Sequence, residues 1–229
     1  MGIRSKIFVA TLAGLLAGAL AAGAYERELN SRSLREAWFL GKDTTFRSEG
    51  FYKDYIRTFP LPKTGVHVAR IEIITPFKEM VDRARRAPDG YNPIQAEADY
   101  KKAAPPLVVR VRLELTASYP GHTPINQPIH LGPVFLRDPD FWREFEVRLE
   151  QAGEIEPVGV RGEPSYFCPT PDATIAIYPP PPRPPCWLAG ADVYLAYDPE
   201  KVASRAVRVI VVTPDGQEVQ AEFDLGKLR

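Results

Sequence analysis

The 229-residue sequence has few of the residues on which most catalytic and metal sites depend, with only two cysteines and three histidines. It contains no G-x-S-x-G elbow, so an α/β-hydrolase site has no support. Neither glycine-rich pattern that cradles phosphates, G-x-G-x-x-G or G-x-x-x-x-G-K-[ST], is present. The 29 basic residues equal the 29 acidic ones, whereas nucleic-acid binding needs a surplus of lysine and arginine to neutralise phosphates. We therefore expect no cofactor, no nucleic-acid partner and no catalytic residue.

The few candidate metal ligands lie on two separate segments. His122 and His130 flank a proline-rich loop, but they lack the i, i+4 helical spacing and the cysteine partners of a strong metal motif. Asp198 and Glu200 are separated by a proline, an arrangement in which carboxylates usually cap a turn. Calcium needs about six to eight oxygen ligands. These four residues are therefore weak metal candidates.

The N-terminus has the three parts of a secretory signal peptide. Arg4 and Lys6 come first, residues 7–23 then carry no charge, and the segment ends on Ala22-Gly23-Ala24. The alternative is an uncleaved membrane anchor. A membrane-spanning helix needs about 20 apolar residues, and residues 7–23 provide 17 without a charge. We predict export to the periplasm or the extracellular space, with residues 1–24 as signal peptide or anchor. The chain would contact a membrane only if residues 7–23 stay uncleaved.

The two cysteines, Cys168 and Cys186, are predicted to form a disulfide, because exported proteins meet oxidising conditions. The segment between them is rich in proline and includes Pro180, Pro181 and Pro182. Consecutive prolines hold the rigid polyproline II conformation. Two interpretations remain open, a docking strip for an aromatic groove and a stiff loop clamped by the disulfide.

Residues 25–62 are predicted to form a helical N-terminal region. Leu34, Trp38 and Phe39 recur at helical spacing, and Gly41 follows where a C-cap glycine would stand. A second short helix is expected over residues 46–58. The apolar face either packs on the domain or binds a partner.

Residues 63–229 are predicted to form a β-sandwich with a helical insertion at 76–104. Thr75-Pro76 and Asn92-Pro93 each combine a capping residue with proline at the first helical position. The charged end of the first inserted helix, residues 82–86, is expected to be a solvated face. Alternating apolar residues predict about eight strands, the clearest over 107–117 and others at 175–177 and 193–197. The last three, within the C-terminal forty residues, are expected to form a meander. The expected class is α+β, mainly β, with an antiparallel immunoglobulin-like sandwich.

Three stretches resemble a group of uncharacterised bacterial exported proteins. They are SLREAWFLGKD from Ser33, FPLPKTGVHVARIEIITPF from Phe59 and YNPIQAEADY from Tyr91. The C-terminal VYLAYDPEKV and VRVIVVTPDGQEVQAEFDL resemble the end of an immunoglobulin-like sandwich. Neither resemblance implies an activity, because that sandwich is a scaffold that hosts many functions.

These features favour an exported, non-enzymatic binding or structural module of the bacterial cell envelope, with a protein or another envelope component as its partner. One alternative is an envelope hydrolase, carbohydrate-active or metal-assisted, that uses loop carboxylates or histidines. A second is a membrane-anchored assembly factor, which requires the N-terminal segment to stay attached.

Overall fold

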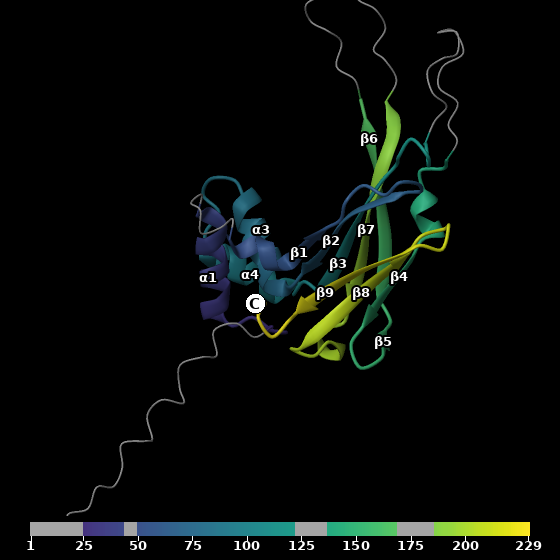
Figure 1. Ribbon diagram of the computed structural model, residues 1–229. Coiled ribbons are helices and arrows are strands. Elements are labelled where there is room, and N and C mark those ends of the chain that lie inside the picture. The colour runs from purple at the N-terminus through teal and green to yellow at the C-terminus, as the bar shows by residue number, and fades with distance from the viewer. Residues whose placement is uncertain (1–24, 44–49, 122–136, 169–185) are drawn as a thin grey trace, which may run out of the picture.

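Two antiparallel sheets face each other like the layers of a sandwich, and a group of helices packs at one end of them (Figure 1). The computed structural model describes residues 25–43, 50–121, 137–168 and 186–229. The expected α+β, mainly β class is confirmed. Among the residues described, no helix is both long and apolar enough to cross a membrane.

Each sheet combines strands that lie far apart in the sequence. The first sheet has the order β1 (Ile56–Thr58), β2 (His67–Ile74), β3 (Leu107–Glu114), β7 (Trp187–Tyr197) and β6 (Gly159–Phe167). The second has the order β5 (Glu154–Ile155), β4 (Glu146–Glu150), β8 (Ala206–Val212) and β9 (Glu218–Asp224). All their pairings are antiparallel.

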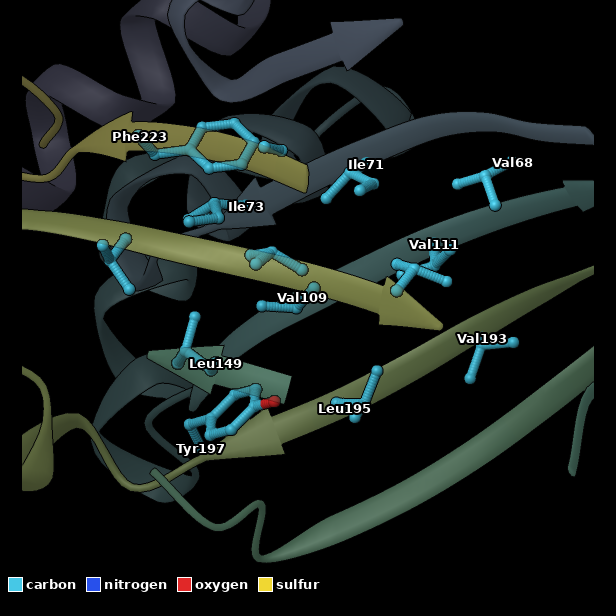
Figure 2. Close-up of a cluster of buried hydrophobic side chains, with 14 of the residues drawn as sticks. Val68, Ile71, Ile73, Val109, Val111, Leu149, Val193, Leu195, Tyr197 and Phe223 are labelled. Atoms are coloured by element: carbon cyan, nitrogen blue, oxygen red, sulfur yellow. The ribbon is translucent and has the colours of Figure 1, made fainter. Parts of the chain in front are cut away.

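The main core lies between the two sheets (Figure 2). In β3 every second side chain is buried, from Leu107 to Leu113, and the residues between them face outward. This follows from the two-residue period of a strand. Leu149 of β4 and Phe223 of β9 close the core from the second sheet. Three of the four outward positions of β3 carry charged side chains, namely Arg110, Arg112 and Glu114.

The helices α1 (Ser31–Lys42), α3 (Pro76–Arg86) and α4 (Pro93–Lys102) enclose a second, smaller core. Both caps of the inserted helices are as expected: Thr75 accepts a hydrogen bond from Lys78 N, and Asn92 forms a capping box with Gln95. Because the cap residue Thr75 directly follows the last residue of β2, the helical insertion starts at the end of that strand. The short 3-10 turns are η1 (Lys53–Tyr55), η2 (Phe141–Glu144) and η3 (Pro199–Lys201).

Two expectations for α1 need correction. Gly41 is no C-cap residue but lies inside the helix, where an added Cβ would stand 2.3 Å from Val81 O of α3. It is glycine because the two helices approach so closely there. Leu34 is buried, but Phe39 is 62% exposed and Trp38 half-buried, so the three do not share one buried face.

Two further expectations differ from the structure. The helix expected over 46–58 ends early, because Ile56–Thr58 pairs with β2 as strand β1. The expected C-terminal meander is wrong as well: β7 joins the first sheet, whereas β8 and β9 form a hairpin in the second. Local pattern predicted these strands, but long-range pairing decides which sheet each one joins.

The predicted disulfide between Cys168 and Cys186 is confirmed, with a sequence separation of 18. It joins the end of β6 to the start of β7, next to the Phe167 and Trp187 rings, which contact each other at a tilt of 31°. The strand expected at 175–177 lies outside the described residues, as do Pro180, Pro181 and Pro182.

Candidate functional site

A groove of about 740 Å³ lies between α3 and the outer face of the first sheet. Its sheet wall comes from four strands and includes Glu72 of β2, Arg110 of β3, Tyr194 of β7 and Arg161 of β6. The C-terminal half of α3 and residues 103–106 form the other wall. A second hollow of about 300 Å³ shares Glu72 and Arg110 with the groove and extends it towards Tyr52. Each of them is within the size range of small-molecule sites, about 300–1,000 Å³.

The register of the first sheet arranges its outward residues in rows that cross the strands. In one row Glu72 lies opposite Arg110, Arg110 opposite Tyr194, and Tyr194 opposite Arg161. The next row runs in the same way through four residues: Arg70, Arg112, Asp192 and Glu163. Directly opposed side chains on one face interact. The sheet wall of the groove thus carries rows of polar side chains from four strands, next to apolar lining residues such as Val108 and Ala196.

A buried lysine anchors α3 to this surface. Lys78 Nζ lies 2.8 Å from Glu72 Oε1 and 2.7 Å from Asp82 Oδ2, and its side chain is only 2% exposed. Tyr52 donates a hydrogen bond of 2.7 Å to Asp82 Oδ1. Burial, and then this bond, raise the pKa of Tyr52 well above its ordinary value, so its hydroxyl remains a donor.

The second oxygen of Glu72 lacks a hydrogen bond within the described part of the chain. Oε2 lies 3.7 Å from Arg110 and 3.8 Å from Arg70, which is ion-pair distance but too long for a hydrogen bond. The Glu72 side chain is only 7% exposed and lines both hollows. Glu72 is therefore a lining residue with one buried carboxylate oxygen that accepts no hydrogen bond.

Asp192 holds the guanidinium groups of β3 in place. Its carboxylate accepts two hydrogen bonds from Arg110, of 3.1 and 3.0 Å, and one of 2.8 Å from Arg112. Burial acts to raise the pKa of Asp192, but the hydrogen bonds and charge of Arg110, and then of Arg112, outweigh it and lower the pKa. The guanidinium carbon of Arg110 also lies 5.6 Å from the centre of the Tyr194 ring. That of Arg161 lies 4.1 Å from the same ring, so both cations contact Tyr194.

The lining of the two hollows carries a surplus of three positive charges, although the whole chain is neutral. Seven lining residues are basic: Arg70, Lys78, Arg83, Arg85, Arg86, Arg110 and Arg161. Four are acidic: Glu72, Glu79, Asp82 and Glu163. A hollow lined mainly by one sign of charge concentrates ligands of the other sign.

Of the candidate site residues predicted from the sequence, none that the structure describes lines either hollow. Asp198 accepts a hydrogen bond from Glu200 N at the start of η3, and Glu200 pairs with Arg27 at 3.3 Å. His122 and His130 fall outside the described residues. The part of the chain that the structure covers contains no group of three or more histidine, cysteine and carboxylate side chains placed to hold a metal ion. Metal binding at the four candidates stays a prediction.

Sequence reasoning missed the groove entirely. It interpreted Asp82, Arg83, Arg85 and Arg86 as a solvated helix end. Arg85 and Arg86 are exposed, but Asp82 and Arg86 also line both hollows. One signal was present: Lys78 falls next to Phe77 in the first turn of an amphipathic helix, where the buried face begins. A lysine there needs an acidic partner, but nothing in the sequence identifies that partner as Glu72. Comparisons with protein-family models, curated proteins and solved structures each found no match to this chain.

Proposed function

We propose that the chain is an exported, non-enzymatic binding module of the bacterial cell envelope, and that the groove beside α3 is its ligand site. The observation that carries this proposal is the charged groove itself. Its polar groups converge from four strands and one helix, and Glu72 keeps a buried acceptor unused. Ligand sites combine a concave surface with a few fixed polar groups in this way.

Export is supported by the N-terminal segment and by the disulfide. Residues 1–24 have the charge, apolar and small-residue order of a signal peptide. The bridge between Cys168 and Cys186 suits the periplasm or the extracellular space, where disulfides persist. A chain that kept residues 7–23 would instead be a membrane-anchored factor.

We further propose that the two sheets form an immunoglobulin-like sandwich. In that fold the strands A, B, E and D form one sheet, while C, F and G form the other. The order β2-β3-β7-β6 corresponds to A-B-E-D, and β4-β8-β9 corresponds to C-F-G, with β5 beside β4. The helical insertion then occupies the A–B connection. The disulfide joins D and E, so it differs from the B–F bridge of antibody domains.

Fractionation of bacteria that express the full chain tests export. We expect the protein outside the cytoplasm, with an intact mass that lacks about 24 N-terminal residues. A full-length mass in the membrane fraction would favour the anchored alternative. A reduced, full-length protein in the cytoplasm would contradict the proposal.

Co-sedimentation with isolated envelope material tests the groove. Ala196 lines it from β7, so Ala196→Trp fills the space without removing any charge. Gln220→Trp, at an exposed position of β9 in the other sheet, is the matched control. We expect the wild type and Gln220→Trp to sediment with the envelope, whereas Ala196→Trp does not. Equal binding by both variants would contradict the role of the groove.

A further inference from the structure

We infer that the groove binds an anionic ligand that also carries a hydroxyl group beside its charge, the chemistry shared by uronic acids and glycerol phosphates. This inference rests on the proposed function, because it names the ligand class of the same site. It follows from which donors and acceptors of the groove remain unused.

The acidic groups of the groove are already engaged by its own cations and donors. Glu79 lies 2.8 Å from Arg83, and Glu163 pairs with Arg161. Asp82 is held by the buried lysine of α3 and by the Tyr52 hydroxyl. Because these carboxylates are already paired, a cationic ligand would gain little from them.

The guanidinium groups, in contrast, keep donors to spare. Each carries five N–H donors. Arg161 is 62% exposed, and its ion pair is with Glu163 alone among the residues described. Arg70 has one ion pair there, the long one of 3.8 Å to Glu72. Arg86 donates one hydrogen bond to the Asp82 carbonyl and lies 3.9 Å from Glu79. A carboxylate or phosphate supplies the acceptors that these groups lack.

The unused Glu72 oxygen sets a second requirement, which is a donor on the ligand. An ammonium group would meet Lys78 2.8 Å from the other carboxylate oxygen, and Arg110 and Arg70 within 3.8 Å of Oε2. Like charges at such distances repel. A hydroxyl group donates a hydrogen bond without adding positive charge. The ligand that satisfies both sides of the groove is therefore an anion with a neighbouring hydroxyl.

Titration of the mature protein with small probes tests this inference by calorimetry or NMR. The anions are D-glucuronate and glycerol 3-phosphate, and their neutral counterparts are D-glucose and glycerol. Cyclohexanecarboxylate is an anion without a hydroxyl. We expect at least one hydroxylated anion to bind about tenfold more tightly than its neutral counterpart and than cyclohexanecarboxylate, with weaker binding at high salt. The preferred anion distinguishes carboxylate from phosphate sources.

Variants tie that binding to the groove. Arg161→Gln and Arg70→Gln should each weaken it by about tenfold, the loss of one charge-assisted hydrogen bond. Arg208→Gln is the matched control, because Arg208 pairs with Glu150 on the second sheet. Arg161 is exposed, so its variant keeps the test valid even if Arg70→Gln fails to fold. Equal losses with Arg208→Gln would overturn the inference.

Failure of the inference and failure of the proposed function give different results. If no anion binds, or if the neutral counterparts bind as tightly, the ligand class is wrong. The groove would still be the binding site if Ala196→Trp abolishes envelope binding. If Ala196→Trp leaves envelope binding intact, both proposals fail.

Discussion

Replacing Lys78 with methionine should strongly destabilise the protein. The methionine fills a similar volume but leaves the Glu72 carboxylate, only 7% exposed, without its 2.8 Å partner. Breaking a buried ion pair on one side costs about 3–5 kcal/mol. Arg110 and Arg70 remain within 3.8 Å of Glu72 and compensate in part. We therefore expect a loss of about 3 kcal/mol in the free energy of unfolding, at the lower end of that range.

Urea denaturation measures this loss, and the chain offers a matched control. Lys101 lies 2.8 Å from Glu97, the same distance as the Lys78 pair, but its side chain is 70% exposed. Lys101→Met should cost only about 0.3–0.5 kcal/mol, as is usual for an exposed i, i+4 pair. The two variants share the substitution and the 2.8 Å distance, and they differ in burial and in the second carboxylate, Asp82, that Lys78 contacts.

A double variant separates the pair from its surroundings. Glu72→Leu removes the orphaned carboxylate, so Lys78→Met combined with Glu72→Leu should be more stable than Lys78→Met alone. The reasoning is refuted if Lys78→Met costs no more than Lys101→Met. It is also refuted if the two substitutions at the buried pair simply add.

Three further predictions concern packing, pH and the disulfide. Gly41→Ala should destabilise the protein. Alanine gains about 1 kcal/mol of helix propensity, but its methyl group would lie 2.3 Å from Val81 O, so α1 and α3 must separate at a cost of about 1–3 kcal/mol. Thermal denaturation checks this against Gly50→Ala, whose methyl meets nothing within 4 Å, and an unchanged Tm for Gly41→Ala would contradict it. Asp192 has a lowered pKa when folded, so the stability it contributes is complete above the unfolded pKa of about 4 and is lost as pH falls through the folded value. The difference in unfolding free energy between wild type and Asp192→Asn should therefore shrink from pH 6 to about pH 2, and a constant difference would count against the ion pair. Cys168→Ser should cost less than the about 3 kcal/mol expected for a loop of this length, because proline already restricts the unfolded loop; urea denaturation measures it, and a larger loss would contradict the argument.

Features of the fold that depend on neighbouring residues could be predicted from the sequence. The caps at Thr75 and Asn92 and the alternation over Leu107–Glu114 are local, and the structure contains all of them. Strand β6 escaped prediction because Gly159 and Pro164 are unfavourable in strands. Proline is tolerated there because, among the described strands, β6 pairs with β7 alone and lies at the edge of its sheet.

The groove could not be predicted, because its rows exist only after the strands have paired. Glu72 and Arg110 are neighbours through register, and Arg110 reaches Asp192 across 82 residues of sequence. In the sequence each is an ordinary outward residue of an alternating strand. Their shared site arises from long-range strand pairing. The two-residue period predicts which face a residue occupies, but not which strand lies beside it.

Hydrogen exchange of the mature protein, with and without envelope material, tests most directly the claim that the groove is the binding site. We predict that binding slows amide exchange in α3 and along β6, an edge strand of the sheet wall, because both elements line the groove. Protection confined to α1 around Trp38 and Phe39, with α3 and β6 unchanged, would contradict the account. It would show that the helical face, and not the groove, contacts the partner.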